Sequence, residues 1–184
     1  MKLFLKEIID LVVDNRGKNP SEYVSTGIPV IDNYLINDSY YPDLSKVNRY
    51  ISNETYNNFI RCKTIEDDVL VTLVGNGYGN ITLSPSNTII IQNTVGLRTN
   101  NKCIQKYLYY LLLSNKQQIR NLNRGCAQPS IKVSDLLSIQ INLHSLKEQV
   151  HIINTISLLW VFPLLFLLIL CFLQIKLIIQ QKLF

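Results

Sequence analysis

The sequence predicts an α+β fold, in which strands form a sheet and helices flank it. Two β-branched runs, at residues 69–74 and 88–91, are bounded by Gly, Asn, Ser and Pro, as buried strands typically are. Between residues 104 and 112, apolar side chains recur at the three- and four-residue spacing of an amphipathic helix. Ser145 and Glu148 form an S-x-x-E capping box, so a further helix is expected to begin near Leu146.

The first sixty residues are expected to hold one helix, one short strand and a folded loop. An apolar stripe predicts a helix over residues 3–13, which the segment "DNRGKNP" at 14–20 ends. The segment "STGIPVID" at 25–32 indicates a short buried strand. The turn-rich residues that follow lead into a capped turn or helix at 53–59.

The second half is expected to hold a long helix followed by two short strands. Thr99 or Asn100 can cap the amphipathic helix, which continues unevenly to Ile119 and Leu122. After the turn at Gly125, "SIKV" at 130–133 and "SIQINL" at 138–143 indicate strands. The whole chain of 184 residues is long enough for one domain with its own core.

The charge distribution is uneven. The net charge is +5, but residues 69–134 contain no Asp or Glu. The cations of this segment are Arg98, Lys102, Lys106, Lys116, Arg120, Arg124 and Lys132. We expect the segment to form a positive face, which is either a solvated surface or a surface that binds a polyanion.

No motif in the sequence predicts a catalytic or metal centre. The four Cys residues include no C-x-x-C pair, and neither His has the spacing of a ligand or a triad member, which favours reduced thiols in a cytosolic protein. The glycine-rich "GNGYGN" at 75–80 is followed by strand-like sequence, whereas a phosphate-binding loop opens a helix, so a turn between strands is predicted. The acidic Glu66–Asp68 is expected to be a solvated turn. The opening residues alternate charged and apolar residues and do not resemble a signal peptide.

The last thirty residues differ from the rest. Residues 156–173 carry no charge and are barely long enough to cross a hydrocarbon core of about 30 Å. Pro163 in this run is tolerated in a membrane helix and unfavourable in a soluble one. A membrane span is therefore one interpretation of this segment.

Several segments, in order, resemble one target recognition domain of the specificity (S) subunit of type I restriction-modification systems. The segments are "DNRGKNP", "GIPVID", "ISNETYNNF", "DDVLVTLVGNGYG", "IIIQNTVGLR", "KYLYYLLLS" and "GCAQPSIKVSDLLSIQINLHSLKEQ". Together they cover about 155 residues, and the last two are the most characteristic. The resemblance implies a DNA methylase specificity domain with a twisted mixed sheet and flanking helices, followed by a long helix that packs against its counterpart.

The resemblance also implies a function without chemistry of its own. Such a domain binds double-stranded DNA and directs the complex to one half of a bipartite site in the bacterial cytoplasm, as part of the defence against foreign DNA. No cofactor is expected on this chain, because the modification (methyltransferase) and restriction subunits use S-adenosylmethionine, ATP and Mg. Those subunits are the expected partners. The family also allows self-pairing through the C-terminal helix, which the loss of most of that helix disfavours in this chain.

Candidate DNA-binding residues follow from the chemistry that DNA presents. Cations bind phosphates, Arg pairs well with guanine, and Asn or Gln pairs well with adenine. Arg124 and Lys132 are predicted phosphate contacts, while Gln128 and Ser130 either fix their turn or touch DNA. The base-reading candidates are Tyr78, Asn80, Gln92, Asn93 and Arg98, and weaker candidates in an early loop are Arg16 and Lys18.

The chain departs from the family after Glu148, where a long charged helix is expected. We interpret residues 1–144 as the target recognition domain, 145–155 as the start of the spacer helix and 156–184 as an apolar tail. The absence of acids after Glu148 favours a frameshifted or truncated S subunit over an authentic membrane anchor. The alternatives are a non-functional remnant, and a membrane-anchored protein with a cytosolic binding domain that holds the membrane through residues 156–173.

Overall fold

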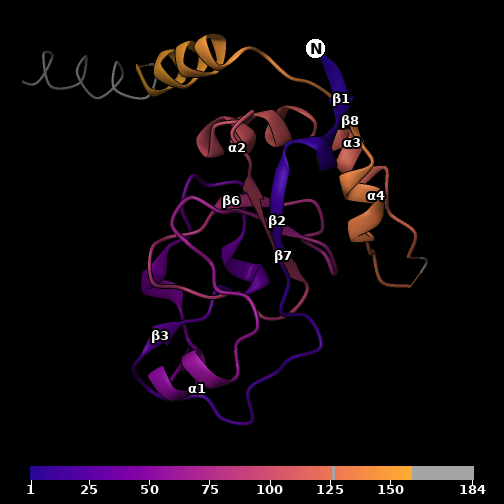
Figure 1. The fold of residues 1–184 in the computed structure, drawn as a ribbon. Helices are drawn as coiled ribbons and strands as arrows, with labels where there is room; N and C mark the ends of the chain where they lie inside the picture. The colour runs from indigo at the N-terminus through magenta and orange to yellow at the C-terminus, as the bar shows by residue number, and fades with distance from the viewer. Residues whose placement is uncertain (126, 159–184) are drawn as a thin grey trace, which may run out of the picture.

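A four-stranded antiparallel sheet lies at the centre of the protein. The computed structural model describes residues 1–125 and 127–158 (Figure 1). The strand order is β2-β7-β5-β6. The bounds are Ile9–Val13 for β2, Val69–Thr72 for β5, Ile81–Leu83 for β6 and Thr94–Thr99 for β7. The strand predicted at 69–74 is therefore confirmed as β5, and the sequence after the glycine-rich turn forms β6.

The sheet is buried on both faces, between a helical layer and a loop-rich layer. Successive side chains of a strand point to opposite faces. In β5, Val69 and Val71 belong to the core under the helices, whereas Leu70 packs with Ile31 and Ile90 of the loop-rich layer. The helices are α2 (Gln105–Ser114), α3 (Lys116–Arg120) and α4 (Val133–Leu137).

The first thirteen residues form strands instead of the predicted helix. Strand β1 (Lys2–Phe4) pairs with β8 (Gln140–Asn142), a 3-10 turn covers Leu5–Glu7, and β2 pairs with β7. Leu3, Leu5 and Ile8 are buried as the apolar pattern predicts. The helix prediction is wrong because distant strands supply the backbone partners of this segment, and such pairing overrides a weak helical periodicity.

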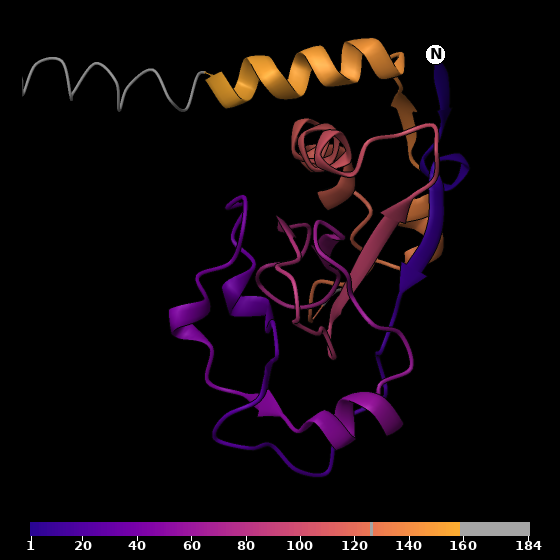
Figure 2. The same cartoon turned by 60° about the vertical axis from the view of Figure 1, so that its left-hand side comes forward.

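Residues 14–68 form the loop-rich layer, which lies on the far side of the sheet from α2 (Figure 2). Its regular elements are β3 (Ile28–Pro29), β4 (Tyr50–Ile51), α1 (Asn53–Asn58) and 3-10 turns at Asn33–Leu35 and Leu44–Lys46. The predicted strand at 25–32 and the predicted helix at 53–59 are confirmed. Ser52 caps α1 by accepting a hydrogen bond from the Thr55 amide at 3.0 Å.

Residues 88–91 are buried but form no ladder, so the strand predicted there is wrong. Ile89 and Ile91 pack with Ile28, and Ile90 packs into the other loop-side cluster. The only bridge in this segment is a single parallel one, from Ile89 to Val30. The β-branched run therefore fills two cores in an extended conformation, and regular pairing starts at Thr94.

The later helices follow the predicted order with shifted ends. Helix α2 starts five residues after Asn100, because Gln105 accepts a hydrogen bond from the Thr99 amide at 2.8 Å and keeps Thr99 at the end of β7. The uneven continuation predicted to Ile119 and Leu122 is confirmed as far as Arg120, as α3. The strand predicted at 130–133 is reduced to one bridge between Ser130 and Val74, whereas the second strand is confirmed as β8.

The capping box at Ser145 is confirmed, and it opens the C-terminal helix. Glu148 accepts hydrogen bonds from the Ser145 amide at 2.8 Å and from its hydroxyl at 2.7 Å. Residues 146–158 are helical. The predicted apolar tail lies almost wholly outside the described residues, and in the part of the chain that is described no helix has the length and apolarity of a membrane span.

The α+β prediction, with a twisted sheet and flanking helices, is confirmed. Among the described residues every ladder is antiparallel, and the bridge between Val30 and Ile89 is the parallel component.

Gly27 holds a backbone approach that no larger residue fits. Its φ is +151°, and a Cβ at this position would overlap the Ile51 carbonyl oxygen. We expect Gly27→Ala to lower the free energy of unfolding in urea by about 2 kcal/mol or more. Gly17→Ala is the matched control, because its φ is also positive at +77° but nothing lies within 4 Å, so about 1 kcal/mol is expected. Equal losses for the two variants would contradict the role of the close approach.

Candidate nucleic-acid interface

The antiparallel sheet gathers several predicted site residues at one end. The end of β2, the start of β7, the end of β5 and the start of β6 lie together, because Val13 pairs with Gly96, Thr72 with Thr94, and Val71 with Ile81. The segments that leave these strand ends therefore form one region of the surface. They are residues 14–18, 74–80 and 92–93. We call this region the recognition end of the sheet.

The glycine-rich turn at 75–80 joins β5 to β6, as predicted. Gly75 and Gly79 have φ values of +95° and +76°, and the Gly79 amide donates to the Thr72 carbonyl at 2.7 Å. Asn80 is committed inside the protein. Its side-chain Nδ2 donates to the Ile36 carbonyl at 2.9 Å, and its Oδ1 accepts from Lys116 Nζ at 2.9 Å. The Tyr78 ring lies 5.9 Å from the Arg120 guanidinium.

The loop at 123–132 is attached to the same end of the sheet. The Gly75 amide donates to the Pro129 carbonyl at 3.0 Å, and Ser130 bridges to Val74. Asn123 Oδ1 accepts from the amides of Gly125 and Ser130 at 3.0 and 2.8 Å. The backbone of Ser130 therefore fixes this turn.

Three side chains of that loop differ in what they touch. Gln128 and Lys132 are exposed, and within the described residues neither side chain has a hydrogen-bond or ion-pair partner. Arg124, in contrast, forms an ion pair with Asp135, with Nε 2.7 Å from Oδ2. The loop thus offers two free polar side chains and one partly neutralised cation at the surface.

Arg98 is a structural residue in this fold. Its Nε and Nη2 donate to both oxygens of Asp68, at 2.9 and 2.7 Å, and the Asp68 side chain is fully buried. The same Nη2 donates to the Lys63 carbonyl at 3.2 Å. The hydrogen bonds to Asp68 raise the pKa of the Arg98 guanidinium above its ordinary value. Arg98 thus joins β7 to the start of β5 and to the segment around Lys63.

The acid-free segment is less positive in the fold than its sequence indicates. Four of its seven cations form ion pairs with Asp residues outside it. Besides Arg98 and Arg124, Lys106 Nζ lies 3.4 Å from Asp67, and Lys116 pairs with Asp38. The positive face expected over residues 69–134 is therefore partly neutralised, because the folded chain brings Asp residues from before and after the segment against these cations.

A different set of cations lies near the end of β2. Arg16 forms a bidentate pair with Asp14, with Nη2 2.7 Å from Oδ2, and these hydrogen bonds lower the pKa of Asp14 below its ordinary value. Lys18 Nζ lies 5.7 Å from the centre of the Phe59 ring, and Lys63 Nζ lies 4.4 Å from that of Tyr56.

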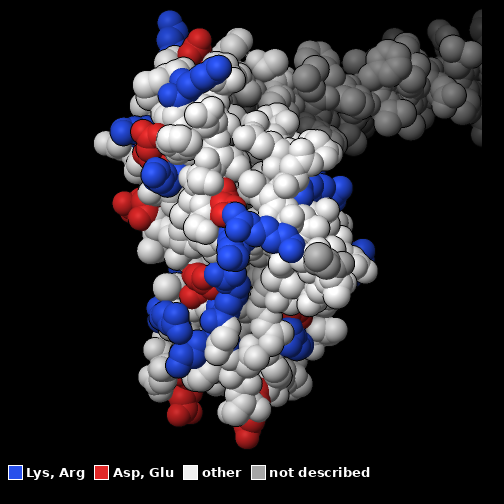
Figure 3. Space-filling model, turned by 90° about the vertical axis from the view of Figure 1, so that its right-hand side faces the viewer, with Lys and Arg blue, Asp and Glu red and all other residues white. Residues whose placement is uncertain are grey.

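Arg61 and Lys63 were missed by the sequence reasoning. Both are exposed, and Arg61 is near enough to Asp14 to contribute to lowering its pKa. The acidic Glu66–Asp68 follows them closely in the sequence, so the net charge of this stretch does not indicate a cluster of cations. On the face that Figure 3 views, Lys and Arg side chains form a band with Asp and Glu beside it. This face is the right-hand side of Figure 1, which carries β8, α3 and α4.

An open hollow of about 580 Å³ lies at the recognition end of the sheet. It is lined by Asp32, Asn33, Tyr34, Asn48, Arg49, Gln92 and Asn93. The predicted residues Gln92 and Asn93 thus share one hollow with Asn48 and Arg49, which the sequence did not indicate. Within the described residues, the side-chain amides of Asn48, Gln92 and Asn93 have no hydrogen-bond partner.

The charged wall of the hollow is held in place by its neighbours. Arg49 Nε donates to Asp32 at 2.8 Å, and the guanidinium carbon lies 4.9 Å from the centre of the Tyr23 ring. Both contacts restrict the guanidinium to one plane. Asn93 has a φ of +60°, a conformation that Asn tolerates better than most residues and that directs the chain from the hollow into β7.

Buried Asn15 joins the segments that carry Arg16, Arg61 and Lys63 to the segment that leads into the hollow. Its Nδ2 donates to the carbonyls of Cys62 and Ile90 at 2.7 and 3.0 Å, and its Oδ1 accepts from the Cys62 amide at 2.9 Å. Asn15 precedes Arg16, Cys62 lies between Arg61 and Lys63, and Ile90 lies two residues before Gln92. One fully buried side chain thus fixes the segments that carry the cations and the free amides.

Two buried titratable groups have strongly raised pKa values. Burial raises the pKa of the Cys103 thiol to about 12, and it raises the pKa of Tyr109 to about 12 as well. Such groups stay protonated at neutral pH and are poor nucleophiles. Over residues 1–125 and 127–158, no group of three or more His, Cys, Asp or Glu is placed to hold a metal ion.

The sequence over this whole region matches a known family. A family model described as "Type I restriction modification DNA specificity domain" matches residues 1–159. The chain belongs to this family. A comparison with curated proteins finds no match.

Solved structures share the fold of this specificity domain. The S subunit from M. genitalium is 20% identical, with a TM-score of 0.63 over 86% of this chain and 38% of that chain. The HsdS subunit from Thermoanaerobacter tengcongensis is 19% identical, with a TM-score of 0.64 over 85% of this chain and 36% of that chain. A structure described in terms of the assembly and conformational transition of the type I R-M system is 18% identical, with a TM-score of 0.68 over 87% and 38%. The specificity domain thus spans less than two fifths of these longer chains.

The ion pair of Arg98 predicts a loss of stability on substitution. Arg98→Ala leaves the buried Asp68 carboxylate without its partner, so we expect the free energy of unfolding in urea to fall by on the order of 3 kcal/mol. Lys132→Ala is the control, because this exposed side chain has no ion-pair partner within the described residues, and its effect is expected to be below about 0.5 kcal/mol. If Arg98→Ala unfolded at the same urea concentration as the native chain, the structural role of Arg98 would be refuted.

Proposed function

We propose that this chain is the DNA-recognition module that directs a type I restriction-modification complex to one half of a bipartite site. The observation that carries the proposal is the hollow with free amides at the recognition end of the sheet, which Asn15 connects to the segments that carry Arg16, Arg61 and Lys63. Membership of the DNA specificity domain family supports the same function.

The hollow has the groups that read base edges. Carboxamides can bond bidentately to adenine, and a guanidinium can bond bidentately to the N7 and O6 atoms of guanine. Asn48, Gln92 and Asn93 supply free amides, and Arg49 supplies a guanidinium whose orientation Asp32 fixes. The fixed guanidinium of Arg49 loses little entropy on binding, which favours discrimination between bases. We therefore assign base reading to this hollow.

The cations near the end of β2 fit contacts to phosphates. Arg16, Lys18, Arg61 and Lys63 come from two segments that Asn15 holds together, and Lys132 is a further exposed cation. Phosphate contacts supply affinity that does not depend on sequence, and they position the module on the duplex. Arg98 and Asn80 are assigned instead to stability, because both are committed to contacts inside the protein.

The chemistry of the complex is assigned to its other subunits. In this proposal the modification and restriction subunits use S-adenosylmethionine, ATP and Mg, and this chain binds none of them. Docking of those subunits and self-pairing are assigned to the helix that starts at residue 146, which projects from the domain (Figure 2). The work of this chain is to choose the DNA sequence.

Gln92 supplies the first test of base reading. Duplexes that bind the full chain would be selected from a random library, and the affinities of single base-pair variants would then be compared. We expect Gln92→Ala to reduce discrimination at one base pair by about 1–3 kcal/mol, while discrimination at other positions and the stability stay unchanged. Gln118→Ala is the control, because this exposed amide lies in a different hollow. An unchanged sequence preference in both Gln92→Ala and Asn48→Ala would exclude the hollow as the reading site.

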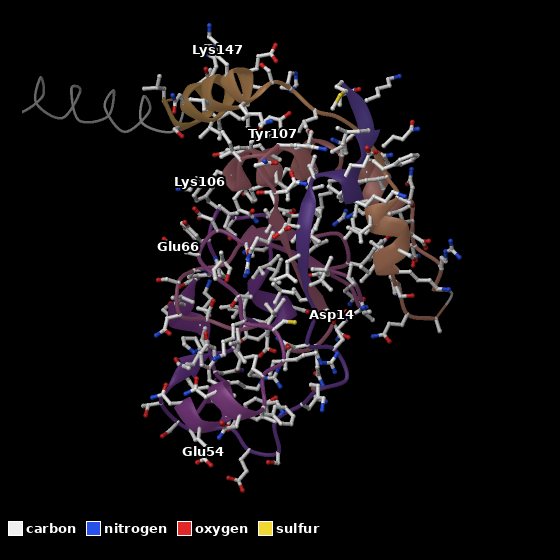
Figure 4. All side chains as sticks on the ribbon, viewed as in Figure 1. Asp14, Glu54, Glu66, Lys106, Tyr107 and Lys147 are labelled. Carbon is white, nitrogen blue, oxygen red and sulfur yellow. The ribbon has the colours of Figure 1, made fainter. Side chains whose placement is uncertain are left out.

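The cations near the end of β2 predict a change in the salt dependence of DNA binding. We expect Lys18→Ala, Arg61→Ala and Lys63→Ala each to weaken binding to all duplexes alike, and to reduce the slope of log affinity against log salt by about one. Lys147→Ala is the matched control, since this exposed Lys lies on the C-terminal helix, far from Asp14 (Figure 4). Binding to one duplex would be titrated at several salt concentrations, which measures both the affinity and its salt slope. If Lys147→Ala lowered the slope as much as the other variants do, the assignment would be contradicted.

A further inference from the structure

The C-terminal helix touches the domain with only part of its surface. Figures 1 and 2 show it lying across α2 and extending away from the sheet. Leu146 and Val150 are about half exposed, whereas Ile152 and Ile153 pack against the main core. Gln149, which lies between these residues in the sequence, is fully buried. Because only part of the helix packs against the domain, specific polar contacts are needed to fix its direction relative to the sheet. We call such a set of contacts a lock.

Gln149 makes every hydrogen bond that this lock needs. Its Oε1 accepts from the Ile104 amide at 2.8 Å, and its Nε2 donates to the carbonyls of Lys102 and His144 at 3.0 and 2.9 Å. Both N–H groups and the oxygen of the carboxamide are thus engaged. Ile104 is the N-cap residue of α2, so the helix is tied to the point at which the chain passes from β7 to α2.

A second polar contact lies next to this lock. The Tyr107 hydroxyl and His144 Nδ1 are 2.6 Å apart, and the two rings are edge to face with centroids 6.0 Å apart. Tyr107 is on the first turn of α2, and Figure 4 shows it below the C-terminal helix. This contact holds His144, which lies just before the capping box. The start of the helix is therefore held by His144 before its first residue and by Gln149 after it.

The position requires a carboxamide. A Leu of similar size would leave the Ile104 amide and two carbonyls without partners, and each unsatisfied buried group is costly. A Glu could still accept from Ile104, but its charge would face the carbonyls of Lys102 and His144. Gln alone supplies one acceptor and two donors in this arrangement.

We propose that Gln149 is a positioning residue that fixes the direction in which the C-terminal helix leaves the domain. The helix and the recognition end of the sheet then move as one rigid body, so anything bound to the helix is held at a fixed distance and angle from the bases that are read. That functional consequence rests on the proposed function, whereas the rigid connection itself does not.

The test measures the order of the helix relative to the sheet in the full chain without DNA. Residual dipolar couplings of backbone amides in residues 146–158 are expected to fit the same alignment tensor as those of β5 and β7. In Gln149→Leu, we expect the helix couplings to depart from that tensor while the sheet couplings are kept, and the Ile104 amide to exchange with solvent roughly tenfold faster. If the helix of Gln149→Leu still shared the alignment tensor of the sheet, the proposal would be overturned.

Two further variants complete the design. Lys147→Ala changes an exposed side chain of the same helix, and its couplings are expected to match those of the native chain. Gln149→Glu keeps the acceptor for Ile104, and its carboxyl regains one donor when it is protonated, so the helix is expected to become more ordered as the pH falls. A lack of such recovery would also count against the lock, and it remains measurable if Gln149→Leu does not fold. Because no DNA is present, a failure of the proposed function leaves these outcomes unaffected.

Discussion

Side-chain amides hold this domain together where it has neither ladders nor long helices. A carboxamide carries a donor and an acceptor on one rigid group, so a single residue can satisfy the backbone of two or three segments. Asn15 and Gln149 each bond the backbone of two or more segments, whereas Asn33, Asn80 and Gln105 each bond the backbone of one. Buried backbone groups must find partners, and in residues 14–68 few regular elements supply them. The surface loops at the recognition end of the sheet depend on Asn15, Asn33 and Asn80 for their shape.

The same chemistry limits what the sequence could say about the site. Asn80 and Gln92 were equivalent candidates, because an amide that can pair with adenine can equally pair with a peptide group. The fold separates them, since the Ile36 carbonyl and Lys116 approach Asn80, whereas Gln92 faces the hollow. The cations, like the amides, could not be told apart from the sequence. Arg98 meets a buried Asp that precedes β5, while Arg61 and Lys63 stay exposed although acids follow them in the sequence. Sequence chemistry therefore predicted the kinds of group in the site better than their positions.

The elements that could be predicted are those with strong local signals. The β-branched run of β5, the Ser cap of α1 and the capping box at Ser145 each specify their structure within a few residues. Residues 3–13 and 88–91 lacked such a signal, and their apolar spacing fits more than one conformation. Partners far along the chain decided the outcome in both places. Strand β1 pairs with β8, and the run at 88–91 is placed between two cores that include residues from the loop-rich layer.

The pairing of β1 with β8 brings the two ends of the domain together. The amino group of Met1 donates to the Leu143 carbonyl at 2.8 Å, just before the C-terminal helix begins. This junction lies at the opposite end of the sheet from the recognition end, because β1 leads into the start of β2 and not its end. A domain with this closure is suited to circular permutation. It can also be placed in tandem with another copy through a single attachment point, without a linker that crosses the recognition end of the sheet.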